Sequence, residues 1–83
     1  MNIPYCKNNG RALSVVVNIQ RAADVFLVDQ YNFQRYQNGM SFKYYGGHYY
    51  HNPVKITVTG HDIWYLIVND GIGSQYSYRW IQQ

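Results

Sequence analysis

The sequence has no glutamate, one cysteine, two prolines and few charged residues, and each shortage narrows the possible functions. With only four aspartates, paired-carboxylate catalysis has little support, and we expect these side chains to form turn and capping hydrogen bonds at turns and element ends. The lone Cys6 excludes an internal disulfide and a cysteine-rich zinc site. The sequence also has no apolar run near the roughly 20 residues of a membrane span and no signal-peptide pattern. We therefore expect a soluble, cytoplasmic protein.

Nucleophilic catalysis has no recognisable motif in this chain. None of the serines lies in a Gly-x-Ser-x-Gly setting. A pairing of Cys6 with one of the three histidines is compatible with the spacing, but nothing beside Cys6 in the sequence would activate its thiol. We expect no enzyme, no catalytic residue and no cofactor.

The distribution of apolar residues predicts an all-β fold. At 83 residues the chain forms one domain, residues 1–83, with room for one modest core. Short alternating or apolar segments separated by turn residues predict a small antiparallel β-sandwich or barrel of six to eight short strands. Residues 1–11 are expected to be an extended lead-in. The predicted strands cover residues 13–19, 25–28, 42–45, 48–51, 54–59, 63–68 and 76–81, with 25–28 and 63–68 central because they are apolar on both faces.

One segment, residues 29–39, breaks the β pattern and predicts a short helical insertion. Asp29 is a suitable N-cap, and Asn38-Gly39 is a suitable C-terminal stop. Phe33 and Tyr36 are three residues apart and share a face of such a helix. We expect them to pack the helix onto the sheet.

The stretch Tyr44–His51 has the highest density of aromatic residues in the chain. It reads Tyr-Tyr-Gly-Gly-His-Tyr-Tyr-His, so two tyrosine pairs flank Gly46-Gly47. Two adjacent glycines supply the positive φ angles of a tight turn. The sequence therefore predicts a β-hairpin with arms 42–45 and 48–51.

The net charge of +3 lies on the same part of the chain. Between Asp29 and Asp62 there is no acidic residue, and this interval contains Arg35, Lys43 and Lys55. Cations, tyrosine rings and close backbone approach at glycine suit a small anionic ligand with a ring, such as a nucleotide-derived signal. A charge of +3 is too small for a long phosphate track, so we expect no long nucleic acid and no membrane as partner.

These observations predict a non-catalytic binding module. Nine residues form the predicted ligand-binding site: Arg35, Lys43, Tyr44, Tyr45, Gly46, Gly47, His48, Tyr49 and Tyr50. The alternative is a protein-interaction or self-assembly module, possible as a homo-oligomer, in which the aromatic hairpin is the interface. A metal site at His48-x-x-His51 with His61 and Asp62 is disfavoured, because residues three apart in a strand point to opposite faces.

From about residue 15 to residue 80 the sequence resembles a small bacterial family known as domain of unknown function 1883. The resemblance implies an all-β module without established activity. Some members are joined to a TIR domain, which in bacteria cleaves NAD or makes nucleotide signals in antiviral defence. This implies a role as a sensor or as a protein that sequesters a signal. The resemblance rests on Ala22-Ala23-Asp24-Val25, Asn32-Phe33 with Tyr36 and Gly39, Tyr44-Tyr45-Gly46-Gly47, Asn52-Pro53-Val54 and the strands around Trp64.

Overall fold

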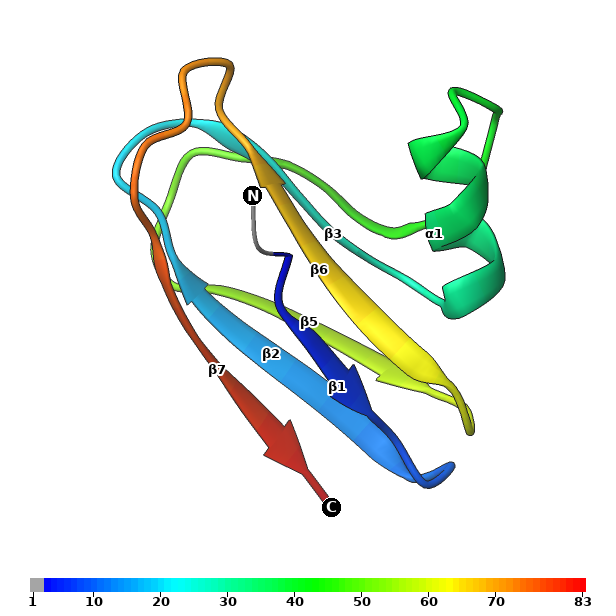
Figure 1. Cartoon of the computed structure of the whole chain (residues 1–83). Helices are drawn as coiled ribbons and strands as arrows, with labels where there is room; N and C mark the ends of the chain where they lie inside the picture. Colours follow the sequence, from blue (N-terminus) through cyan, green and yellow to red (C-terminus); the bar gives the residue numbers. More distant parts are fainter. Residues whose placement is uncertain (1–2) are drawn as a thin grey trace.

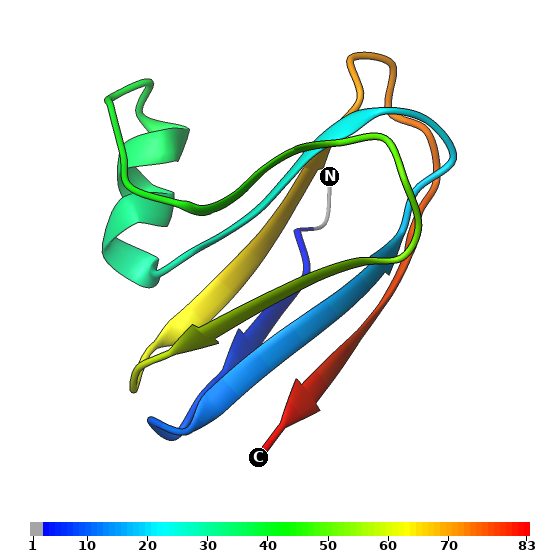
Figure 2. The ribbon, with the colours of Figure 1, turned by 180° about the vertical axis from the view of Figure 1, so that it is seen from behind.

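The structure, a computed structural model, describes residues 3–83 and confirms the predicted fold class. Within that range, seven strands form two antiparallel sheets, and one short helix lies outside them (Figure 1). Seen from behind, the helix again lies beside the strands rather than between the two sheets (Figure 2). The elements are β1 (Tyr5–Lys7), β2 (Ala12–Asn18), β3 (Ala23–Val28), α1 (Gln30–Gln37), β4 (Tyr45–Tyr49), β5 (Val54–Thr59), β6 (Ile63–Asn69) and β7 (Ser77–Gln82).

The two sheets differ in size. The four-stranded sheet has the order β1-β6-β3-β4, and the three-stranded sheet has the order β5-β2-β7. The strands predicted to be central, 25–28 and 63–68, correspond to β3 and β6, which are the interior strands of the larger sheet. This confirms the prediction that the two strands that are apolar on both faces are central in their sheet.

Alternating side chains place the core between the sheets. Leu13, Val15 and Val17 of β2 are completely buried. In β5 the buried positions are Val54, Ile56 and Val58, and the residues between them are exposed, as the alternation predicted. From the larger sheet, Ala23, Val25, Leu27, Trp64 and Leu66 complete the same cluster.

The helix follows its predicted capping signals. Asp29 is the N-cap, and its Oδ1 accepts a hydrogen bond from the Asn32 amide at 2.9 Å. Gly39, just beyond the helix, has a φ of 69°. Phe33 stacks on Tyr65 of β6 with ring centroids 4.0 Å apart, so the helix packs on the outer face of the larger sheet, as expected. We call this face the helix face.

The predicted hairpin at Tyr44–His51 is wrong. Residues 45–49 form one strand, β4, which pairs along its length with β3. Gly46 lies opposite Phe26 with a φ of 144°, and a Cβ built there would lie 2.2 Å from the Val25 carbonyl oxygen. The glycine is therefore required by the close approach of two strands and not by a turn.

The Asn52 side chain holds the end of β2. The Asn52 side chain bonds the backbone of Ile19 twice, accepting from its N–H and donating to its carbonyl, both at 2.7 Å. This joins the segment between β4 and β5 to the end of β2.

In the predicted extended lead-in, residues 1–2 lie outside the described residues, and residues 5–7 form β1, which pairs with β6.

Candidate ligand-binding site

Strand β4 sends the predicted site residues to both faces of the larger sheet. Tyr45 makes an edge-on contact with Trp64, and Tyr49 packs against the core cluster, so both point to the inner face. His48 lies on the other face, where its Nδ1 is 2.9 Å from Asp24 Oδ1. Alternation along one strand therefore separates side chains that a hairpin would have grouped.

The helix face carries a continuous aromatic cluster centred on Phe26. Its ring lies 5.3 Å from Tyr44, 5.8 Å from Phe42 and 6.2 Å from Tyr36, measured between centroids. Tyr44 is thus part of the packing between β3, the helix and the segment that precedes β4. Its side chain remains about half exposed, so the cluster is open to solvent at this end.

A buried asparagine fixes Lys43 beside the helix that also carries Arg35. Asn32, on the first turn of α1, donates from Nδ2 to Asp29 Oδ1 at 2.9 Å. Its Oδ1 accepts a hydrogen bond from the backbone N–H of Lys43, also at 2.9 Å. This side chain therefore fixes Lys43 beside the start of the helix, although the two residues are 11 positions apart.

The loop after the helix folds back through Arg35. The backbone carbonyl of Arg35 accepts from the Met40 N–H at 2.9 Å, and its side-chain Nε donates to the Ser41 carbonyl at 2.5 Å. The guanidinium carbon lies 5.8 Å from the centre of the Tyr31 ring. Arg35 is thereby held against the loop, with its guanidinium beside the Tyr31 ring.

These contacts build a shallow hollow of about 630 Å³, which we call the helix hollow. Among the residues of the range 3–83 that line the hollow, one carries a carboxylate, Asp29, and that group already caps the helix. Arg35 and Lys43 therefore give the hollow a positive potential, and Tyr31 and Phe42 give it ring surfaces. The lining residues are Asp29, Tyr31, Asn32, Arg35, Ser41, Phe42 and Lys43.

A second hollow, of about 320 Å³, lies between Asp24, Phe26, Tyr44, Gly47 and His48. Here the carboxylate of Asp24 pairs with His48, and both side chains are more than half exposed. An exposed pair of this kind contributes little to stability. Because Asp24 offsets any positive charge on His48, this hollow attracts an anion less than the helix hollow does.

The structure thus divides the nine predicted residues. It brings Arg35 and Lys43 together, places Tyr44, Gly47 and His48 at the second hollow, and turns Tyr45 and Tyr49 toward the core. Gly46 serves strand pairing, and Tyr50 is 80% exposed beyond the end of β4. Tyr31 and Ser41 were missing from the predicted site. Tyr31 lies four residues before Arg35, about one helical turn away, and Ser41 lies six residues after it. A predicted helix followed by a loop that folds back would have placed both residues beside Arg35.

The aspartates are mostly engaged as the sequence suggested. Asp29 caps the helix, and Asp62 Oδ1 accepts from the Ile63 and Gln30 amides. Hydrogen bonds from the Ser74 side chain and from the backbone N–H groups of residues 72–74 hold the pKa of Asp70 well below its usual range. Asp24 differs from the expectation, because it lies within β3 and pairs with His48.

Cys6 is poorly suited to nucleophilic chemistry. Its side chain lies partly buried against the core, and this burial raises the pKa of the thiol. Because only the thiolate reacts, we predict that iodoacetamide alkylates Cys6 several-fold more slowly in the folded protein than in urea at the same mildly alkaline pH. Mass spectrometry of timed samples measures both rates. Equal rates would contradict the burial of the thiol.

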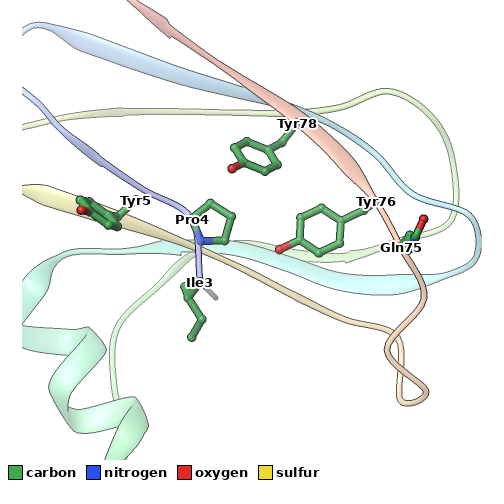
Figure 3. Close-up of a pocket in the computed structure, with 6 residues that line it drawn as sticks. All are labelled: Ile3, Pro4, Tyr5, Gln75, Tyr76 and Tyr78. Carbon is green, nitrogen blue, oxygen red and sulfur yellow. The ribbon is translucent and has the colours of Figure 1, made fainter. Parts of the chain in front are cut away.

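Residues 3–83 lack two features, a clustered set of metal ligands and a membrane-spanning helix. No group of three or more histidine, cysteine or aspartate side chains is arranged to hold a metal ion. The same range contains no helix long and apolar enough to cross a membrane. A third hollow, of about 530 Å³, lies at the opposite side of the sandwich from β4, where Tyr76 and Tyr78 point toward Pro4 (Figure 3).

Fold and surface together define a small β-sandwich with a helical insertion and a positively charged hollow beside that helix. The chain belongs to the family described as domain of unknown function (DUF1883), whose model matches residues 6–77. The match therefore runs from β1 to the first residue of β7 and includes the whole helix hollow. Comparisons with curated proteins and with solved structures find no significant match.

Proposed function

We propose that the chain is a non-catalytic module that binds a small anionic ligand with a planar ring, of the nucleotide type, in the helix hollow. One observation carries the proposal. Arg35 and Lys43 line the same hollow as Tyr31, and the one carboxylate there is already bonded to the helix N-terminus. Guanidinium and ammonium groups bind phosphate through charge-assisted hydrogen bonds, and a tyrosine face is a stacking surface for a base.

The shape of the hollow limits the class of ligand. At about 630 Å³ it is large enough for a nucleotide-sized molecule, and typical small-molecule sites fall in the same range. Two cations are enough for one or two phosphates. They are too few for the long series of phosphate contacts that nucleic-acid binding requires. We extend the proposal to a sensor or signal-sequestering role in the cytoplasm, which needs ligand binding and no catalysis.

The proposal predicts that nucleotide binding depends on both cations. In calorimetric titrations against a panel of NAD-derived and cyclic nucleotides, we expect at least one ligand to bind. Each of Arg35→Ala and Lys43→Ala should weaken it about tenfold or more, because a hydrogen bond to a charged group contributes roughly 1.5–3 kcal/mol.

Lys55→Ala is the matched control. Lys55 belongs to the same acid-free interval but lies exposed on β5, in the other sheet, so its loss should change the affinity less than twofold. Lys43 is the cleaner test of the two site cations, because within residues 3–83 it is held through its backbone N–H and its side chain makes no hydrogen bond. Absence of heat with every nucleotide, or equal losses in Lys43→Ala and Lys55→Ala, would refute the proposed site.

The alternative function, a self-assembly or protein-interaction module, no longer has a hairpin to act as its interface. It is supported instead by β7, an edge strand of the smaller sheet. An interaction through β7 is independent of the proposed ligand site.

A further inference from the structure

Four strands form the outer edges of the two sheets, and they are unequal as pairing surfaces. Strand β1 has three residues, and β4 contains Gly46 at a positive φ, which interrupts a regular strand. Strand β5 lies beside β4 on the closed side of the sandwich and carries Lys55. Strand β7 has six residues, contains no glycine or proline, and pairs only with β2 within residues 3–83. Such an edge is a template for another strand.

The register with β2 shows which backbone groups of β7 are free. The Gln83 N–H donates to the Ala12 carbonyl at 3.2 Å, so residues 12 and 83 form a hydrogen-bonded pair. Such pairs alternate along an antiparallel ladder, so Ser77, Arg79 and Ile81 also bond β2. The N–H and C=O groups of the intervening residues, Tyr78, Trp80 and Gln82, point away from β2, toward the free edge.

The space beside this edge is open. Figure 3 shows Tyr76 and Tyr78 pointing toward Pro4 on the β1 side, beside a hollow of about 530 Å³. At the other end of β7, Gln82 Nε2 donates to the Lys7 carbonyl at 2.8 Å, so the side chain bridges to β1. Neither contact uses the outward backbone groups of β7.

We propose that β7 pairs antiparallel with β7 of a second copy of this chain, about a two-fold axis at Trp80. In this register Trp80 of each copy lies opposite the other, and Tyr78 lies opposite Gln82 of the second copy. These are the three residues whose backbone groups face outward, so every pair is hydrogen-bonded, and each exchanges two N–H···O bonds. The two three-stranded sheets then form one continuous sheet.

The side chains of β7 favour a copy of itself in this register. Arg79 and Ile81 are on the outer face, and the register places Arg79 of one copy opposite Ile81 of the other. No two cations lie directly opposite, which would oppose pairing. On the inner face, the facing tryptophans form a cross-strand aromatic pair. Trp80 is partly exposed and already packs against the core, so the partner ring adds to an existing apolar surface.

The pairing is tested with two substitutions at Tyr78. Tyr78→Pro removes both the ring and the outward N–H, which makes no hydrogen bond to β2, whereas Tyr78→Val removes the ring and keeps the N–H. In sedimentation equilibrium over a wide concentration series, we expect dimers for wild type and Tyr78→Val. We expect Tyr78→Pro to dissociate at least tenfold more readily. Protection of the Arg79 and Ile81 amides from hydrogen exchange checks that each variant is folded.

Hydrogen exchange and charge identify the register. Amides of Tyr78, Trp80 and Gln82 should gain protection as concentration rises, while those of Arg79 and Ile81 are protected throughout. Ile81→Glu should tighten the dimer by pairing with Arg79 of the second copy, and Ile81→Lys should weaken it. A monomer at every concentration, a dimer unaffected by Tyr78→Pro, or concentration-dependent protection in β4 would overturn the proposal.

Discussion

Gly46→Ala is expected to destabilise the protein by about 3 kcal/mol or more, a combination of overpacking and an unfavourable positive φ. The added Cβ would lie 2.2 Å from the Val25 carbonyl oxygen and 2.7 Å from Phe26 Cα, and neither is a flexible side-chain end. Strand β4 must therefore move away from β3, which loosens the edge that carries Tyr45 and Tyr49. Urea unfolding followed by tryptophan fluorescence measures the loss. The thermal midpoint should fall by roughly 12–24 °C.

Gly47→Ala is the control for this change. It lies in the same strand, its φ is not positive, and nothing lies within 4 Å of an added Cβ. We expect it to be neutral or to stabilise the strand by about 0.5 kcal/mol. Equal destabilisation by the two substitutions would show that the Gly-Gly pair acts as a flexible turn, as the sequence first suggested, and not as a site of close strand approach.

Asn32→Leu is expected to cost about 1–3 kcal/mol, because the partly buried N–H of Lys43 loses its acceptor. The asparagine is 9% exposed and joins Asp29 to the Lys43 backbone. A leucine of similar size fills the space but leaves the Lys43 N–H unbonded. Denaturation measures the destabilisation, and hydrogen exchange should show faster exchange at the Lys43 amide. The helix hollow would lose the fixed position of one of its two cations.

Gln34→Leu is the matched control, since Gln34 is exposed on the same helix and its side chain makes no hydrogen bond within residues 3–83. A surface change of this kind should alter stability by less than about 0.5 kcal/mol. If Asn32→Leu is as stable as Gln34→Leu, the asparagine does not hold the loop. The approach of Lys43 to the helix would then need another explanation.

Most of the fold follows from local patterns in the sequence. The alternation in β5 predicted its buried residues, because a strand buried on one face has apolar residues at every second position. The apolar runs of β3 and β6 predicted their central place, because a strand between two neighbours is apolar on both faces. Asp29 and Asn38-Gly39 predicted the helix ends, because capping depends on nearby residues alone. Strand β1 was not recognised, since three residues are too few to show a period.

The predicted hairpin failed for a physical reason. Two glycines permit a tight turn, and they also permit two backbones to approach closely. Only the position of β3 decides between these, and β3 is about 20 residues away in the sequence. The cations of the site were predicted from the acid-free interval, but the position of Lys43 beside the helix depends on Asn32, which looked like an ordinary helix residue.

The order of strand pairing has a consequence for how the chain folds. Strand β1 pairs with β6, β2 with β5 and β7, and β3 with β6, and the one sequential pair, β3 with β4, has the helix between its strands. Within residues 3–83, no two strands joined by a short turn pair with each other, so no hairpin of these strands can form early and guide the rest. For the strands of residues 3–83, long loops must therefore close before any ladder is gained, which places this protein among slow folders, with times in the millisecond-to-second range.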